Sequence, residues 1–141
     1  MDLQLIRLLI DFGLMVLIWI VQLVIYPGMC YYKSEDLGNW HKIYTGRIGV
    51  IVGPLMIAQL AIAILQFWFM QSLYTIVSLI VILIIWMLTF LIFVPLHNSI
   101  QPNKSCEEIT NDLVRKNWWR TLLWSLLFLA SLGFKISDYN F

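Results

Sequence analysis

Long apolar stretches alternate with short polar ones along the whole chain, and each of the longest apolar stretches could form a membrane-crossing helix. A span of this kind needs roughly 20 mostly apolar residues. The pattern predicts spans at about 3–26, 48–70, 73–94 and 119–135. The sequence therefore predicts an all-α protein, an integral membrane four-helix transmembrane bundle that forms one domain over residues 1–141.

Two of the predicted spans are continued by polar segments with helical character. Residues 37–47 are amphipathic and run into the second span, whereas residues 107–116 are charged and run into the fourth. We expect both helices to extend beyond the membrane on the cytoplasmic side. Pro27, followed by glycine, should end the first helix, and Pro54 and Pro95 should bend the second and third.

Lysine and arginine residues are concentrated on one side of the predicted bundle. The side with both chain ends has Arg7 and Lys135, and Arg7 lies four residues before Asp11, with which it can pair. The positive-inside rule places the polar connections in the cytoplasm and both termini outside it. The basic residues of those connections and of the adjoining helix ends are Lys33, Lys42, Arg47, Lys104, Arg115, Lys116 and Arg120.

Composition supports a membrane protein and excludes several classes of function. Hydrophobic residues make up 61% of the chain and charged residues 12%, with a mean hydropathy of +0.84, whereas a soluble domain is about one quarter charged. The net charge of +1 and the lack of a basic run predict no nucleic-acid partner. The sequence has no phosphate-binding glycine loop, nucleophile elbow or transporter-like repeat. Membrane lipid and a small lipophilic ligand are the predicted partners, and a homo-oligomer is compatible with the sequence.

Polar and aromatic side chains recur near the cytoplasmic ends of the predicted spans. On each helix they share a face, because residues three, four and seven apart lie over one another. They are Trp19, Gln22 and Tyr26 of the first helix, His41, Tyr44 and Arg47 of the second, His97 and Asn98 of the third, and Asn117, Arg120, Thr121 and Trp124 of the fourth. We expect them to enclose a polar pocket in which a buried arginine needs hydrogen-bond acceptors.

The two histidines and two arginines of this set allow several interpretations. His41 and His97 could be axial ligands of a haem, a catalytic acid or base, or simple partners in an interhelical hydrogen bond. Because no third strong ligand accompanies them, the sequence predicts no bare metal site. Arg47 and Arg120 could anchor their helices at the membrane surface or bind an anionic ligand, and the shared face with Asn117 makes Arg120 the better ligand-binding candidate.

The chain resembles small four-span membrane proteins of the anthrone-oxygenase-like group. The resemblance lies in Trp19-x-x-Gln22-x-x-x-Tyr26-Pro27, His41 with Arg47 and Gly53-Pro54, Pro95-x-His97-Asn98, and Asn117-Trp118-x-Arg120-Thr121-x-x-Trp124. Characterised members of this group are similar to small oxygenases that oxidise a reduced aromatic polyketide to a quinone without a recognised cofactor. A weaker likeness is to small haem-binding protoporphyrinogen oxidases of membranes.

The resemblance implies an oxidoreductase or oxygenase that acts on a small lipophilic aromatic molecule. In that mechanism Arg120 and Asn117 stabilise an enolate or phenolate, and His41 or His97 removes the proton. Two other functions remain open from the sequence. One is a haem or ligand carrier that uses His41 and His97, and the other is a non-catalytic accessory subunit that binds lipid or another membrane protein.

Overall fold

All secondary structure in the described part of the chain is helical. The computed structural model describes residues 2–100 and 107–139. Four of its helical segments are long and apolar enough to cross a membrane: Leu3–Met29, Glu35–Met70, Leu73–Ser99 and Glu107–Ser137. The prediction of an all-α chain with four such helices is therefore confirmed.

These segments form four rods. The first consists of α1 (Leu3–Ile20), the π-helical turn η1 (Val21–Ile25) and α2 (Tyr26–Met29), and the second is α3 (Ser34–Met70). The third consists of α4 (Leu73–Leu88), the π-helical turn η2 (Thr89–Phe93) and α5 (Val94–Ser99), and the fourth is α6 (Glu107–Tyr139).

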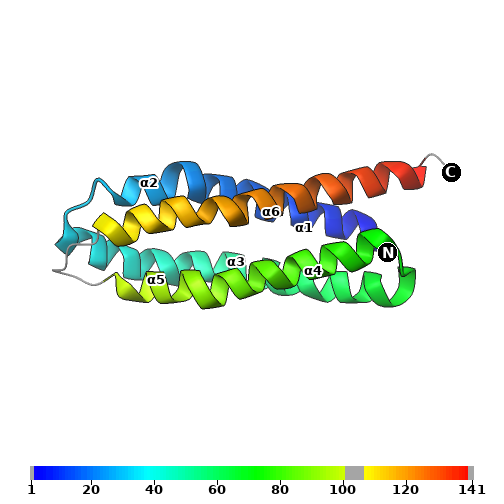
Figure 1. The fold of residues 1–141 in the computed structure, drawn as a ribbon, viewed down its shortest axis with the longest axis horizontal. Coiled ribbons are helices and arrows are strands. Elements are labelled where there is room, and N and C mark those ends of the chain that lie inside the picture. Colours follow the sequence, from blue (N-terminus) through cyan, green and yellow to red (C-terminus); the bar gives the residue numbers. More distant parts are fainter. Residues whose placement is uncertain (1, 101–106, 140–141) are drawn as a thin grey trace.

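The rods lie side by side along their length (Figure 1). The first rod packs against α3 and α6, and α4 also packs against α3 and α6, so the four rods close into a ring. Both ends of the described chain lie at one end of the bundle, together with the turn between α3 and α4. We call this the termini end. The opposite end, where α2 leads into α3, is called the loop end.

The turn between α3 and α4 is tight. Gln71 ends α3 with a φ angle of 23°, in the left-handed region that lets the chain reverse. Ser72 then caps α4, because its hydroxyl accepts a hydrogen bond from the backbone N–H of Thr75, while the Thr75 hydroxyl accepts one from the N–H of Ser72. This reciprocal pair fixes the direction in which α4 leaves the turn.

Neither Pro27 nor Pro95 ends its helix, contrary to the prediction made for Pro27. A proline lacks an N–H and its ring clashes with the carbonyl four residues earlier. For Pro27 and Pro95 these carbonyls belong to Leu23 and Leu91, which lie inside η1 and η2. The wider π turn lets each helix continue past its proline, to Met29 in the first rod.

The π turns also change which side chains face inward. In a regular α-helix Phe90 and Phe93 would lie on nearly the same face. Within η2, Phe93 is 2% exposed and Phe90 is 55% exposed. Such turns are rare and are often found at functional sites.

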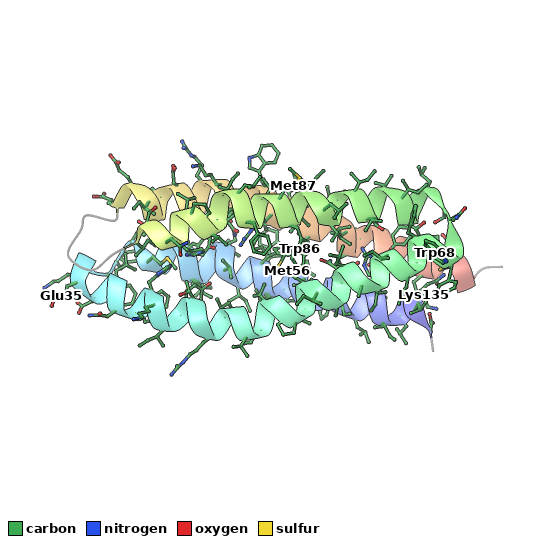
Figure 2. All side chains as sticks on the ribbon, turned by 90° about the horizontal axis from the view of Figure 1, so that it is seen from below. Glu35, Met56, Trp68, Trp86, Met87 and Lys135 are labelled. Carbon is green, nitrogen blue, oxygen red and sulfur yellow. The ribbon has the colours of Figure 1, made fainter. Side chains whose placement is uncertain are left out.

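The bundle has an apolar exterior and a partly polar interior. Figure 2 shows Trp86 directed into the bundle and its neighbour Met87 directed outward. Large apolar side chains exposed on the outside include Leu9, Val50, Leu73 and Leu91. Buried polar side chains include Arg7, Asp11, Gln22, Gln59 and Asn117. An apolar exterior of this extent suits lipid, and buried polar groups between apolar helices mark candidate sites.

Candidate functional site

A cavity of about 650 Å³ lies near the loop end, and all four rods line it. The larger part of its wall area is apolar, and polar side chains also line it. They include the phenols of Tyr26 and Tyr44, the imidazoles of His41 and His97, and the guanidinium of Arg120. Cavities of this size, with an apolar wall and few polar groups, are typical of sites for small organic molecules.

The two histidines contact each other directly. Nε2 of His41 lies 2.7 Å from Nδ1 of His97, and the two rings stack with their centres 4.9 Å apart. On its other side, Nε2 of His97 lies 2.9 Å from the hydroxyl of Tyr26. Tyr26, His97 and His41 therefore form one chain of hydrogen bonds. A neutral imidazole carries one N–H, so the proton on His97 sets the direction of both bonds.

This contact bears on the interpretation of the histidines as a haem pair. Axial imidazoles must both direct a nitrogen at an iron placed between them. Here the facing nitrogens are at hydrogen-bond distance, so they share a proton and leave no space for a metal atom. Among residues 2–100 and 107–139, no group of three or more His, Cys, Asp or Glu side chains is arranged to bind a metal ion. The arrangement fits proton transfer better than haem binding.

Arg120 is buried in the cavity wall, with 8% of its surface exposed. Its Nε donates to Oδ1 of Asn117 at 3.0 Å, and its Nη1 lies 3.5 Å from the hydroxyl of Thr89. The guanidinium carbon lies 3.9 Å from the centre of the Phe93 ring and 5.7 Å from that of Trp124. In the described part of the chain no carboxylate forms an ion pair with Arg120. Its charge is met by neutral groups alone, which is a favourable setting for an anionic ligand.

Three buried polar side chains behind the cavity hold Arg120 in position. Nδ2 of Asn117 donates to Oε1 of Gln22 at 2.9 Å, which turns Oδ1 of Asn117 toward Arg120. Nε2 of Gln22 in turn donates to the carbonyl of Val114 at 3.1 Å, and the Thr121 hydroxyl lies 3.4 Å from Oε1 of Gln22. These bonds tie the first rod to α6 and fix the orientation of the guanidinium.

The structure separates the predicted site residues into three groups. Those that line the cavity are Tyr26, His41, Tyr44, His97, Asn98, Arg120 and Trp124. Those that lie behind it and position Arg120 are Gln22, Asn117 and Thr121.

Trp19 and Arg47 lie away from the cavity. Nε1 of Trp19 donates to the hydroxyl of Ser125 at 3.0 Å, and its ring meets that of Trp118 edge-on. The Arg47 side chain is exposed. At about 100° per residue it projects roughly 60° away from Tyr44, and this rotation is enough to take it out of the cavity.

A second polar cluster lies toward the termini end. Nε of Arg7 donates to both carboxylate oxygens of Asp11 at 2.9 Å, and both side chains are 0% exposed. Nε2 of Gln59 donates to Oδ1 of Asp11 at 2.7 Å, and Nη1 of Arg7 donates to Oε1 of Gln66 at 3.3 Å. In the sequence, the four-residue spacing of Arg7 and Asp11 indicates that the two side chains form an ion pair. Gln59 and Gln66, which share a face of α3, are the sequence signal that this ion pair has hydrogen-bond partners on a second helix.

Comparison of the chain with known protein families, with curated proteins and with solved structures finds no match. The resemblance to the anthrone-oxygenase-like group therefore stays a prediction.

Proposed function

We propose that this protein is an integral membrane enzyme that binds a small lipophilic molecule in the cavity and removes a proton from an acidic position of it. One observation carries the proposal. A buried guanidinium that has no carboxylate partner among the described residues, that of Arg120, lines the same largely apolar cavity as the Tyr26–His97–His41 hydrogen-bond chain. The cavity thus combines an anion-stabilising group with groups that exchange protons.

In this proposal the four apolar helices cross the bilayer, with the loop end in the cytoplasm and both termini outside. The basic side chains near the loop end favour this orientation under the positive-inside rule. α3 has 37 residues and α6 has 33, more than the roughly 20 that a span requires. Their first turns therefore extend beyond the membrane on the cytoplasmic side.

The ligand is a planar aromatic molecule with a phenolic or enolisable oxygen. The apolar lining includes Leu17, Val21, Val52 and Phe93, which suit a lipophilic body. The Arg120 guanidinium suits an oxygen that becomes negative when a proton leaves. A fixed donor in a dry site stabilises such a charge more strongly than water does, because it needs no reorganisation.

The histidine chain accepts the proton. An imidazole at the cavity wall takes it from the ligand, and the 2.7 Å contact between His41 and His97 allows the charge to be shared between the two rings. Tyr26 holds His97 in place through the contact with Nε2. Arg120 stabilises the enolate or phenolate that remains.

The oxygenase reaction implied by the resemblance is the more specific form of this proposal. The enolate of a reduced aromatic ketone reacts with dioxygen, which is the oxidant. The ring CH₂ group becomes a carbonyl, one oxygen atom stays on the ring carbon, and the other leaves with both hydrogens as water. Dioxygen is itself apolar and reaches the cavity through the lipid.

Deprotonation and oxidation can be tested separately with protein in lipid nanodiscs. 2-Naphthol is a lipophilic phenol whose anion absorbs at longer wavelength, so absorbance reports the loss of its proton. We expect the protein to raise the naphtholate fraction at neutral pH relative to empty nanodiscs. Anthrone then tests oxidation, with anthraquinone formation measured against empty nanodiscs. An unchanged naphtholate fraction would contradict the proposal, whereas deprotonation without anthraquinone would remove the oxygenase step alone.

A further inference from the structure

The cavity has an opening between α3 and the α5 end of the third rod. Residues that both line the cavity and are exposed must lie at its opening, and several residues on these two helices meet both conditions. On α3 they are Asn39, Lys42 and Gly49, and on α5 they are Val94 and Asn98. Thr45, which also lines the cavity, lies between Lys42 and Gly49 on the same stripe of α3.

The packing of the helices explains why the opening lies there. Within the described chain, α3 packs against α1 and α4 but has no comparable packing with η2 or α5. Figure 2 shows α3 and the third rod converging near the end that carries Trp68 and diverging toward the end that carries Glu35. The exposed residues that line the cavity lie on this side of the bundle, between α3 and α5.

The rim of the opening changes character along the bundle. Asn39, Lys42 and Asn98 are its polar residues and lie nearer the loop end, whereas Gly49 and Val94 lie in the predicted spans, at the ends that face the loop end. A polar rim at headgroup level above an apolar rim at acyl-chain level matches an amphipathic molecule dissolved in the bilayer. An opening that admits a ligand from water would instead have polar residues along its whole rim.

We propose that the opening between α3 and α5 is a lateral portal through which the ligand enters the cavity from the bilayer. This inference rests on the proposed membrane position of the bundle and the proposed lipophilic ligand. Gly49 keeps the portal open. A side-chain atom built at Gly49 meets no other atom within 4 Å, so the glycine borders empty space and is not required by close packing.

The portal can be tested by cysteine labelling without any ligand. Cys30 and Cys106 are first replaced by serine, and Val21→Cys then places a thiol in the cavity wall on η1, away from α3 and α5. In nanodiscs, N-(1-pyrenyl)maleimide dissolved in the lipid should label this cysteine. The positively charged reagent methanethiosulfonate-ethyltrimethylammonium, which stays in water, should label it much more slowly.

Gly49→Trp should abolish labelling from the lipid because the indole fills the portal. Gly46→Trp is the matched control, since Gly46 lies one turn away, does not line the cavity and also borders empty space. Gly49→Leu provides a smaller plug if the tryptophan variant does not fold. Equal labelling rates in the Gly46 and Gly49 variants, or faster reaction with the charged reagent, would overturn the portal. Because no ligand is present, this result is independent of the naphthol and anthrone experiments.

Discussion

The indole nitrogen of Trp124 donates a hydrogen bond to Oε1 of Gln59 across 3.3 Å, and this bond joins the two polar regions of the bundle. The Trp124 ring lines the cavity and faces the Arg120 guanidinium. Gln59 donates to Asp11, which pairs with Arg7. The wall of the cavity is therefore supported from behind by a buried ion pair. The stability of that pair should decide how firmly the bundle is held together.

Asp11→Asn should destabilise the bundle strongly, because it leaves the Arg7 charge buried without a counter-charge. Breaking a buried pair in this way typically lowers the free energy of unfolding by about 3–5 kcal/mol. The double variant Arg7→Leu/Asp11→Leu should lose less, since no charge remains to be buried. Unfolding of detergent-solubilised protein by sodium dodecyl sulfate measures both. Equal losses in the single and double variants would show that the pair does not matter as a pair.

Asp112 offers a matched control for that experiment. It pairs with Arg115 and Lys116 on the surface of α6, with 35% of its side chain exposed. Exposed pairs of this type contribute little, because solvent and salt screen them. Asp112→Asn should therefore leave the unfolding midpoint nearly unchanged.

The carboxylate of Asp2, which lies at the termini end, should make the stability of the folded protein depend on pH. This carboxylate accepts a hydrogen bond from Nζ of Lys135, and Oδ1 accepts the backbone N–H groups of Gln4 and Leu5. The bond from Lys135, followed by that from Leu5, holds the pKa of Asp2 below its ordinary value of 3.8. A carboxyl group whose pKa is lower in the folded state than in the unfolded state stabilises the fold. This stabilisation is fully present at pH values above the unfolded-state pKa and is lost as the pH falls through the folded-state pKa.

The measurement is a pH series of thermal unfolding midpoints for the wild type and Asp2→Asn. Asparagine still caps α1, so the comparison isolates the charge. The variant should have the lower midpoint near neutral pH, and the two midpoints should converge in strong acid. A difference that stays constant over the whole series would argue against the Lys135 contact.

Much of the helical fold could be predicted from the lengths of the apolar stretches. Four apolar stretches of sufficient length predict four helices. The short connections between them predict that consecutive helices pack side by side and so close into a ring. The π turns could not be predicted in this way. Pro27 and Pro95 signal a disturbance in the helix, but whether the helix breaks, bends or widens depends on packing against the other rods.

The candidate site was predictable to the extent that α-helical spacing holds. This spacing groups Tyr26, His41, His97 and Arg120 of four helices, and all four side chains line one cavity in the structure. The spacing could not distinguish side chains that line the cavity from side chains that lie behind the cavity wall, such as Asn117, because both kinds point into the bundle. Nor could it show that the two imidazoles contact each other, since this depends on the shift in phase that η2 introduces before His97.

Arg120→Gln should abolish the rise in naphtholate, because the glutamine keeps polar atoms in place but removes the charge that stabilises the anion. Hydrogen bonds to charged groups contribute about 1.5–3 kcal/mol, which corresponds to roughly a 10- to 150-fold weaker binding of naphtholate. Arg47→Gln is the control, since Arg47 is exposed and lies outside the cavity. Titration of both variants with 2-naphthol in nanodiscs gives the comparison. Equal losses in the two would point to a general effect of membrane charge.

Asn117→Leu should have a smaller effect of the same kind. The leucine keeps the volume but removes the acceptor at 3.0 Å that orients Nε of Arg120. The charge remains in the cavity, so naphtholate binding should weaken by about tenfold or less. A loss as large as that of Arg120→Gln, with an unchanged unfolding midpoint, would mean that Asn117 contacts the ligand itself.

Removal of either histidine should slow proton transfer from the ligand. A positioned acid or base typically contributes about 10²–10⁴-fold to a rate, and His41→Ala or His97→Ala removes one member of the hydrogen-bonded pair. Tyr26→Phe keeps the ring but removes the hydroxyl that holds His97, so its effect should be smaller. Stopped-flow absorbance after mixing with 2-naphthol measures the rate of anion formation in each variant. If both alanine variants retain the rate and the extent of the wild type, the histidines do not accept the proton and the proposed mechanism is wrong.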